Sequence, residues 1–208
     1  ATVEQFKKAV EDLTRQGAGG IVIDLRDNLG GIMNSALYML DYLLPDQDGT
    51  YSDHEIDGKD RGRTLVLYTE DKEGRNFAYY AQDGHETELP LAVLINQNSA
   101  SSSEIFAGVL KDYHKALLVG TTTYGKGIVQ TEVPLADGSA VKYTSAQYFT
   151  PSGYAVHGKG VEPDLTVEAE EAFLEAGADA ENPDPSIDNQ LREALQALGS
   201  QAASGEQE

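Results

Sequence analysis

Apolar residues follow two different spacings along the first part of the chain, and the change of spacing predicts alternating helices and strands. They recur at helical spacing up to Gln16, and glycines at 17–20 then end that helix. A continuous apolar run at 21–25 predicts a strand. It is followed by the polar loop RDNLGG and by a second helical pattern up to Leu44. This order predicts a βα unit.

The same order returns after residue 90. The run LAVLIN at 91–96 predicts a strand, the following stretch up to Tyr113 contains a helical pattern, and 116–119 predicts the next strand. Strand, helix and strand at this spacing predict parallel pairing through a right-handed crossover. Two further segments, 128–135 and 141–149, flank the turn sequence ADGS and predict a hairpin. A last short strand is expected at 165–167.

The remaining segments predict the domain organisation. Residues 1–168 are expected to form one core, in which 51–89 is a mostly β excursion with short strands at 65–68 and 77–81. Residues 169–208 are expected to form an acidic C-terminal segment with a short helix at 188–198 and a frayed end from 199.

The first residues match a helix-start pattern. Thr2 is followed three residues later by Gln5, which is typical of a capping box and predicts that the Thr2 side chain caps the first helix. A chain that opens on such a pattern is expected to be part of a longer protein.

Charge and composition exclude several classes of function. The chain has 15 basic and 35 acidic residues and a formal charge of −20, which argues against binding to a nucleic-acid backbone. It has no cysteine, so disulfides, thiolate zinc sites and cysteine nucleophiles are excluded. No apolar run approaches the roughly 20 residues that a membrane helix needs, so no membrane span is predicted.

The segment GTTTYGKG at 120–127 nearly spells a phosphate-binding P-loop. A P-loop needs Ser or Thr after the lysine and a helix behind it, whereas here Gly127 follows and the next residues alternate as a strand. Nucleotide binding is therefore rejected. The glycines on either side of Lys126 allow the backbone to turn sharply or to approach another segment closely, and either would let the lysine point inward, although an isolated lysine is more often solvated.

The stretch NSASSSEIFAGVLKDY places four serines just before a predicted helix. On the residues alone, helix capping is the favoured reading, because serine is a common N-cap. A serine at such a turn is also well placed for nucleophilic attack, since the next backbone amide can stabilise an oxyanion. None of the four histidines lies in a motif that supplies a base. Lysine can act as the base only if burial lowers its pKa from about 10.4.

Four motifs in order resemble those of the C-terminal processing peptidases, also called tail-specific proteases. DLRDNLGG is similar to DLRNNPGG of that family, the serine stretch to SASASEI, YGKGIVQT to FGKGxVQ, and YFTPSG is followed by GKGVEPD. The resemblance runs from about residue 3 to 167 and returns at DNQLREALQAL. It implies an α/β fold with a crotonase-like core of βα units and added antiparallel strands.

The resemblance also implies roles for individual residues. Ser101 matches the nucleophile of a Ser-Lys dyad, Lys126 its base, and Gln130 the glutamine that holds the lysine. On a regular strand, residues 126, 128 and 130 share a face, so the Lys126 and Gln130 side chains are expected to meet.

The oxyanion donors implied by the resemblance are the amide of Ser102 and that of Gly30 or Gly31, and the choice between the two glycines stays open. Two positions depart from the family pattern. Ser102 replaces an alanine and brings a hydroxyl that competes for hydrogen bonds, and Leu29 replaces a proline, which loosens the loop.

The implied function is a serine endopeptidase that cleaves near substrate C-termini through an acyl-enzyme, without a metal or cofactor. The substrate is expected to be a polypeptide bound in extended form along a strand edge. The family further implies a PDZ domain in the parent protein, a capacity to oligomerise and an extracytoplasmic location in a bacterium. One alternative is a catalytically silent peptide-binding or scaffold domain of the same fold, and a weaker one is a Ser-His hydrolase.

Overall fold

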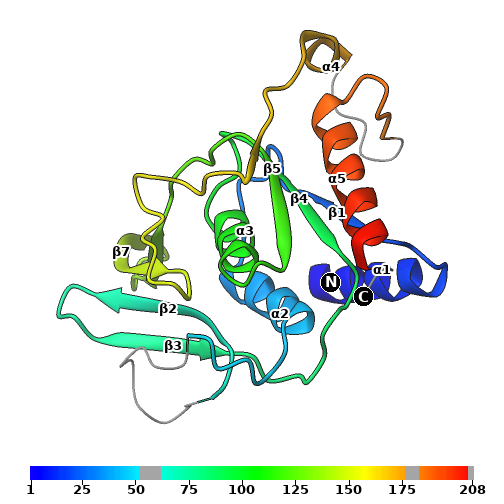
Figure 1. The fold of residues 1–208 in the computed structure, drawn as a ribbon. Coiled ribbons are helices and arrows are strands. Elements are labelled where there is room, and N and C mark those ends of the chain that lie inside the picture. The colour runs from blue at the N-terminus through cyan, green and yellow to red at the C-terminus, as the bar shows by residue number, and fades with distance from the viewer. Residues whose placement is uncertain (52–61, 177–182, 206–208) are drawn as a thin grey trace.

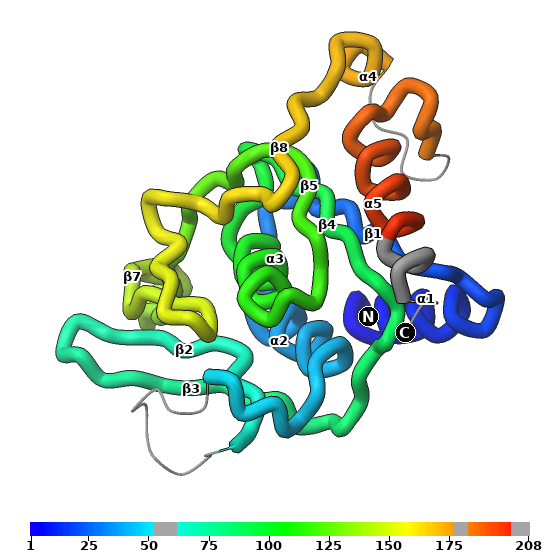
Figure 2. Tube along the Cα trace, in the orientation of Figure 1, coloured from blue at the N-terminus to red at the C-terminus, as the bar shows by residue number. Residues whose placement is uncertain are grey.

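The computed structural model describes residues 1–51, 62–176 and 183–205, and its strands form two four-stranded sheets (Figures 1 and 2). The elements in chain order are α1 (Thr2–Arg15), β1 (Ile21–Asp24), α2 (Met33–Leu43), β2 (Leu65–Asp71), β3 (Asn76–Tyr80), β4 (Leu91–Ile95), α3 (Ser102–Asp112), β5 (Ala116–Gly120), β6 (Ile128–Pro134), β7 (Ala140–Phe149), β8 (Leu165–Thr166), α4 (Glu171–Ala176) and α5 (Asn189–Gly205).

The first sheet is parallel throughout, in the order β1-β4-β5-β8. Its central strand β4 has the sequence LAVLI, and all five residues are buried. Parallel sheets are covered on both faces, which explains why β4 is a continuous apolar run rather than an alternating one. The predicted parallel pairing of the strands at 91–96 and 116–119 is confirmed.

Helices cover both faces of the parallel sheet (Figure 1). One face packs against α1, α2 and α3 in the larger hydrophobic cluster. The other face packs against α5, whose Leu191, Ala194 and Leu198 recur at helical spacing and meet Ala92 and Leu94 of β4. The molecule is therefore a mixed α/β protein with its main core between the sheet and α1–α3.

The second sheet is antiparallel, in the order β3-β2-β7-β6. The predicted β6–β7 hairpin is confirmed, with one irregularity: Val129 pairs with Ala146 and Gln130 with Thr144, so Ser145 is an extra residue in β7. The two strands predicted within 51–89 are present as β2 and β3, and β2 joins β7.

The structure corrects the predictions at both ends of the chain. Helix α1 begins at Thr2 with Ala1 as its N-cap and no side-chain cap, so the predicted capping role of Thr2 is wrong; the Ala1 carbonyl accepts the Gln5 amide at 3.0 Å. The last helix does not fray at 199 but continues to Gly205. A single Gly199 costs a helix only about 1 kcal/mol, which is not enough to end it. The boundary at residue 168 stays a prediction.

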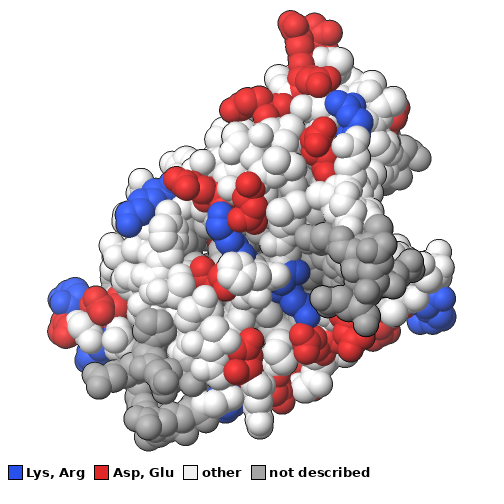
Figure 3. Space-filling view, in the orientation of Figure 1, with Lys and Arg blue, Asp and Glu red and all other residues white. Residues whose placement is uncertain are grey.

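The acidic side chains are unevenly distributed. Figure 3 shows several of them gathered around α4, at the far end of the molecule from β2 and β3. None of the described helices is long and apolar enough to cross a membrane.

Candidate active site

The serine stretch forms a sharp turn between β4 and α3. Ser101 is the N-cap of α3 and has φ 58° and ψ −118°. A positive φ is strained for a residue with a side chain, and such strain concentrates at functional sites. A strained strand-to-helix turn is also the device that presents the nucleophile in many serine hydrolases. The sequence placed Ser101 at a helix start, but nothing in the local pattern predicted the strain.

The loop at 25–31 lies against this turn because β1 and β4 are parallel neighbours, so their carboxyl ends meet at one edge of the sheet. The Ser99 hydroxyl donates to the Leu25 carbonyl at 2.7 Å, and the Ala100 amide donates to the Asn28 carbonyl at 3.0 Å. Ser99 is fully buried, and its hydrogen bond to Leu25 gives it a structural role in the turn.

Gly30 brings the loop close to the turn at Ser101. Its φ is +86°, and a Cβ added there would lie 2.5 Å from the Ala100 carbonyl oxygen and 3.0 Å from the Ser101 Cβ. Only glycine fits this position, because a side chain would collide with the turn and is disfavoured at that φ.

The two glycine amides considered as oxyanion donors both have partners within the chain. The Gly30 amide donates to Asn28 Oδ1 at 2.9 Å. The Gly31 amide lies 3.1 Å from the Ser102 hydroxyl, and that hydroxyl donates to the Gly31 carbonyl at 2.8 Å. The extra hydroxyl of Ser102 therefore occupies one of the candidate donors. By contrast, the Ser102 amide meets no acceptor in the described ranges.

A buried carboxylate joins the Ser101 and Lys126 segments. Glu104 is fully buried, and its Oε2 accepts both the Ser101 amide and the Lys126 amide at 2.8 Å. Its Oε1 accepts the Thr123 hydroxyl and the Gly125 amide, each at 2.6 Å. Because one oxygen holds both amides, the backbones of the predicted nucleophile and base lie side by side.

Tyr148 of β7 makes a second link between the same two segments. Its hydroxyl lies 3.1 Å from the Ser101 carbonyl oxygen and 2.9 Å from that of Lys126. Burial, together with the nearby Glu104 carboxylate, raises the pKa of Tyr148, so the hydroxyl stays neutral and able to donate.

Sequence reasoning missed both of these residues. Glu104 had a usable signal, because Ser101 and Glu104 have the spacing of a capping box. Tyr148 had none, since only the folded sheet brings β7 to the turn.

The glycines beside Lys126 do allow the close approach expected of them. Gly125 has φ +90°, and a Cβ on Gly127 would overlap the backbone of His157. The Lys126 side chain is half-buried, whereas Gln130 is exposed. Within the described residues, neither of their side chains makes a hydrogen bond. Strand β6 begins only at Ile128, so the alternation argument does not extend to Lys126, and the pairing of Lys126 with Gln130 stays a prediction.

The other candidate chemistries have little support in the site. His54 lies outside the described residues, and His85 is stacked on Tyr42 with its Nδ1 at 2.5 Å from the Tyr42 carbonyl. Neither His85 nor His114 nor His157 is hydrogen-bonded to Ser101. Across the described ranges, no cluster of His, Asp or Glu side chains could hold a metal ion.

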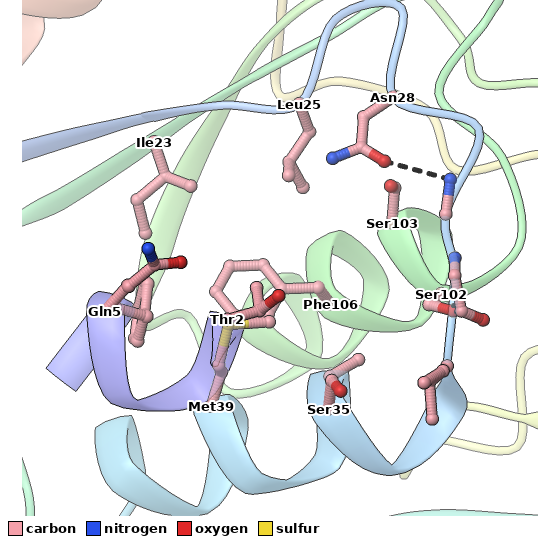
Figure 4. Close-up of a pocket in the computed structure, with 15 residues that line it drawn as sticks. Thr2, Gln5, Ile23, Leu25, Asn28, Ser35, Met39, Ser102, Ser103 and Phe106 are labelled. Atoms are coloured by element: carbon pink, nitrogen blue, oxygen red, sulfur yellow. Dashed lines mark hydrogen bonds between the residues drawn. The ribbon is translucent and has the colours of Figure 1, made fainter.

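A pocket of about 430 Å³ opens beside the glycine loop (Figure 4). Gly30, Gly31 and Ser102 line it on the side of the turn at Ser101. The apolar walls come from β1, the residue after it, and the three covering helices, and consist of Phe6, Ile23, Leu25, Met39 and Phe106.

The fold is that of a mixed α/β protein, and the strained strand-to-helix turn at Ser101 has a geometry that serine hydrolases also use. The sequence profile of peptidase family S41 matches residues 1–167, and the chain belongs to this family. A probable CtpA-like serine protease of Staphylococcus epidermidis is 35% identical over 167 residues, and one of Staphylococcus aureus is 36% identical over 168. In each case 80% of this chain matches only 31% of the relative's length.

Two solved structures have the same fold. The photosystem II D1 C-terminal processing protease is 33% identical with a TM-score of 0.69, over 84% of this chain and 42% of that protein. A putative S41 protease from Bacteroides fragilis has a TM-score of 0.72 over 95% of this chain and 49% of the other, at 18% identity, and that likeness concerns the fold alone. The predicted resemblance to the C-terminal processing peptidases is confirmed.

Proposed function

We propose that this chain is the catalytic core of a serine endopeptidase that cleaves polypeptides near their C-termini through a Ser101–Lys126 dyad. The observation that carries the proposal is the double link between the two segments. Glu104 holds their amides and Tyr148 contacts their carbonyls, so two segments 25 residues apart in sequence are fixed against each other. Family membership and the strained turn at Ser101 add support.

In the proposed reaction, the Ser101 hydroxyl attacks the scissile carbonyl while the neutral Lys126 amine takes its proton. The oxyanion is held by the Ser102 amide and by one from Gly30 or Gly31. The lysine then returns the proton to the leaving amine, and a water molecule hydrolyses the acyl-enzyme by the same route. Gln130 is assigned to holding the lysine.

The substrate and context are proposed at the same level. The substrate lies extended along a strand edge, because backbone hydrogen bonds give affinity that tolerates different sequences. The proposal includes a crotonase-like core and a reaction that uses no metal or cofactor. Because the chain spans 31% of the length of the curated relatives it matches, a PDZ domain, oligomerisation and an extracytoplasmic location are proposals about the longer protein.

The test compares Ser101→Ala and Lys126→Ala with the parent, using cleavage of an unstructured peptide and labelling by a fluorophosphonate probe. Both activities should disappear in Ser101→Ala and fall at least a hundredfold in Lys126→Ala. Lys142→Ala removes an exposed lysine on β7 and should leave both unchanged.

The pH profile adds a second criterion, since a neutral lysine base predicts rates that rise toward the basic side. A rate that titrates near neutrality would favour a histidine base. Labelling that ignores Lys126 would refute the dyad, and an absence of labelling with retained peptide binding would favour a silent scaffold.

A further inference from the structure

The pocket beside the glycine loop has walls suited to an apolar ligand. Phe6 and Phe106 meet edge to face with ring centres 6.0 Å apart, and Met39 of α2 lines the same pocket (Figure 4). No lysine, arginine, aspartate or glutamate is among the described residues that line it. A pocket of about 430 Å³ is within the range of small-ligand sites, and it can take a large side chain.

The position of the pocket identifies what would enter it. Ser102, Gly30 and Gly31 line one side of it, which we call the rim, and the proposed oxyanion donors are the amide of Ser102 and that of one of the two glycines. A peptide whose scissile carbonyl oxygen lies at these amides has the α-carbon of the same residue directly beside the rim. The side chain of that residue is therefore the group nearest to the opening. Neighbouring residues of an extended chain point to the other side.

We propose that this pocket binds the side chain on the acyl side of the scissile bond and selects a large apolar residue such as leucine, methionine or phenylalanine. The inference rests on the proposed function, because it uses the oxyanion site to orient the peptide. Each buried methylene favours the larger side chain, so leucine should exceed alanine on the order of 30-fold in kcat/KM. Lysine and aspartate should be poor, because an unpaired charge would be buried among these walls.

The residues that line the pocket away from the glycine loop limit the size of the side chain that it can hold. Ser35 and Ala36 lie on α2, and Thr2 and Gln5 on α1 form a polar end away from the glycine loop (Figure 4). A larger residue at Ser35 would fill space that the substrate side chain needs. Ser35 is only half-buried, so a leucine there has room to be accommodated by the fold.

The experiment measures kcat/KM for a peptide series that differs only at the acyl-side residue, in the parent and in Ser35→Leu. The leucine-to-alanine ratio should fall at least tenfold in Ser35→Leu, while cleavage after alanine persists. The matched control is Asn34→Leu, which adds the same side chain at an exposed position outside the pocket, and it should keep the parental ratio. An unchanged ratio in Ser35→Leu, with cleavage still dependent on Ser101, overturns the inference.

A binding measurement separates this inference from the proposed function. In the Ser101→Ala protein, the affinity of product-like peptides ending in leucine, alanine or aspartate can be measured by calorimetry. Tighter binding of the leucine peptide, lost in Ser35→Leu and kept in Asn34→Leu, supports the pocket even if no cleavage is observed. Equal affinities for the three peptides overturn it. If the parent shows no cleavage that depends on Ser101, but the leucine peptide still binds selectively, the proposed function is refuted and the pocket assignment stands.

Discussion

If the proposed oxyanion site uses the Gly31 amide, replacing Ser102 by alanine should make the enzyme faster, and in either case it should make the fold less stable. The Ser102 hydroxyl contacts the Gly31 amide at 3.1 Å and donates to the Gly31 carbonyl at 2.8 Å. An oxyanion that uses the Gly31 amide must first displace this hydroxyl. Alanine removes the competitor and leaves the backbone amide of residue 102 in place.

The magnitude follows from the strength of one neutral hydrogen bond. Such a bond contributes about 1 kcal/mol net, and 1.36 kcal/mol corresponds to a tenfold rate, so kcat/KM should rise about fivefold. The same lost contacts should lower the free energy of unfolding by about 1 kcal/mol, because Ser102 is 8% exposed and its hydroxyl bridges two segments.

The assay is steady-state cleavage of an unstructured peptide, paired with urea denaturation. Ser139→Ala removes a hydroxyl that is also hydrogen-bonded, to Asp137 in the exposed hairpin loop, and should leave kcat/KM unchanged. Asn28→Ala makes the complementary test, since Asn28 Oδ1 accepts the Gly30 amide at 2.9 Å. A gain in Ser102→Ala alone assigns the oxyanion to Gly31, and a gain in Asn28→Ala alone assigns it to Gly30. If neither variant is faster than the parent, the reasoning is refuted.

Three further substitutions test the links around the site. Glu104→Gln turns one buried acceptor oxygen into a donor, so it should lower the free energy of unfolding by about 3 kcal/mol and kcat by more than a hundredfold. The exposed Glu175→Gln should change neither quantity, and a parental kcat in Glu104→Gln would contradict the linking role. Tyr148→Phe should lower kcat about tenfold, as measured by peptide cleavage. The pKa of Tyr148 is raised in the folded state, so above a pH of about 10 the unfolded state gives up this proton first and the parent loses stability as pH rises. Tyr148→Phe should lose less stability over the same range, and equal slopes of unfolding free energy against pH would contradict this. Asp188→Ala removes the buried carboxylate that pairs with Arg26 at 2.7 Å and accepts the Leu191 amide at 3.0 Å, whereas Arg26 keeps Asp24 and Gln190 as partners. It should cost about 2 kcal/mol in urea denaturation, and a cost below about 0.5 kcal/mol would show that this pair is dispensable.

The sequence was informative wherever a local pattern determines the outcome. The apolar run of β4 and the helical spacing of Leu191, Ala194 and Leu198 correspond to a strand and a helix in the structure. The glycines at 125 and 127 predicted a close approach of backbones, and the structure places them against 157–160.

Long-range contacts could not be predicted in this way. Tyr148 meets the turn only because β7 belongs to a second sheet that packs against it, and no spacing in the sequence encodes that meeting. The hydroxyl of Ser102 was expected to compete for hydrogen bonds, but its partner, Gly31, is 71 residues away in sequence. Helix α5 extended past the expected end because a single glycine is a weak stop signal.

The backbone of Ser101 implies a trade-off between durability and chemistry. Its φ of 58° with ψ of −118° is a conformation that glycine adopts without penalty and serine adopts at a cost of roughly 1–3 kcal/mol. A Ser101→Gly protein should thus be inert yet resist heat better than its parent. Selection for stability alone would favour glycine at this position, so a serine held in this conformation is what the proposed nucleophile role requires.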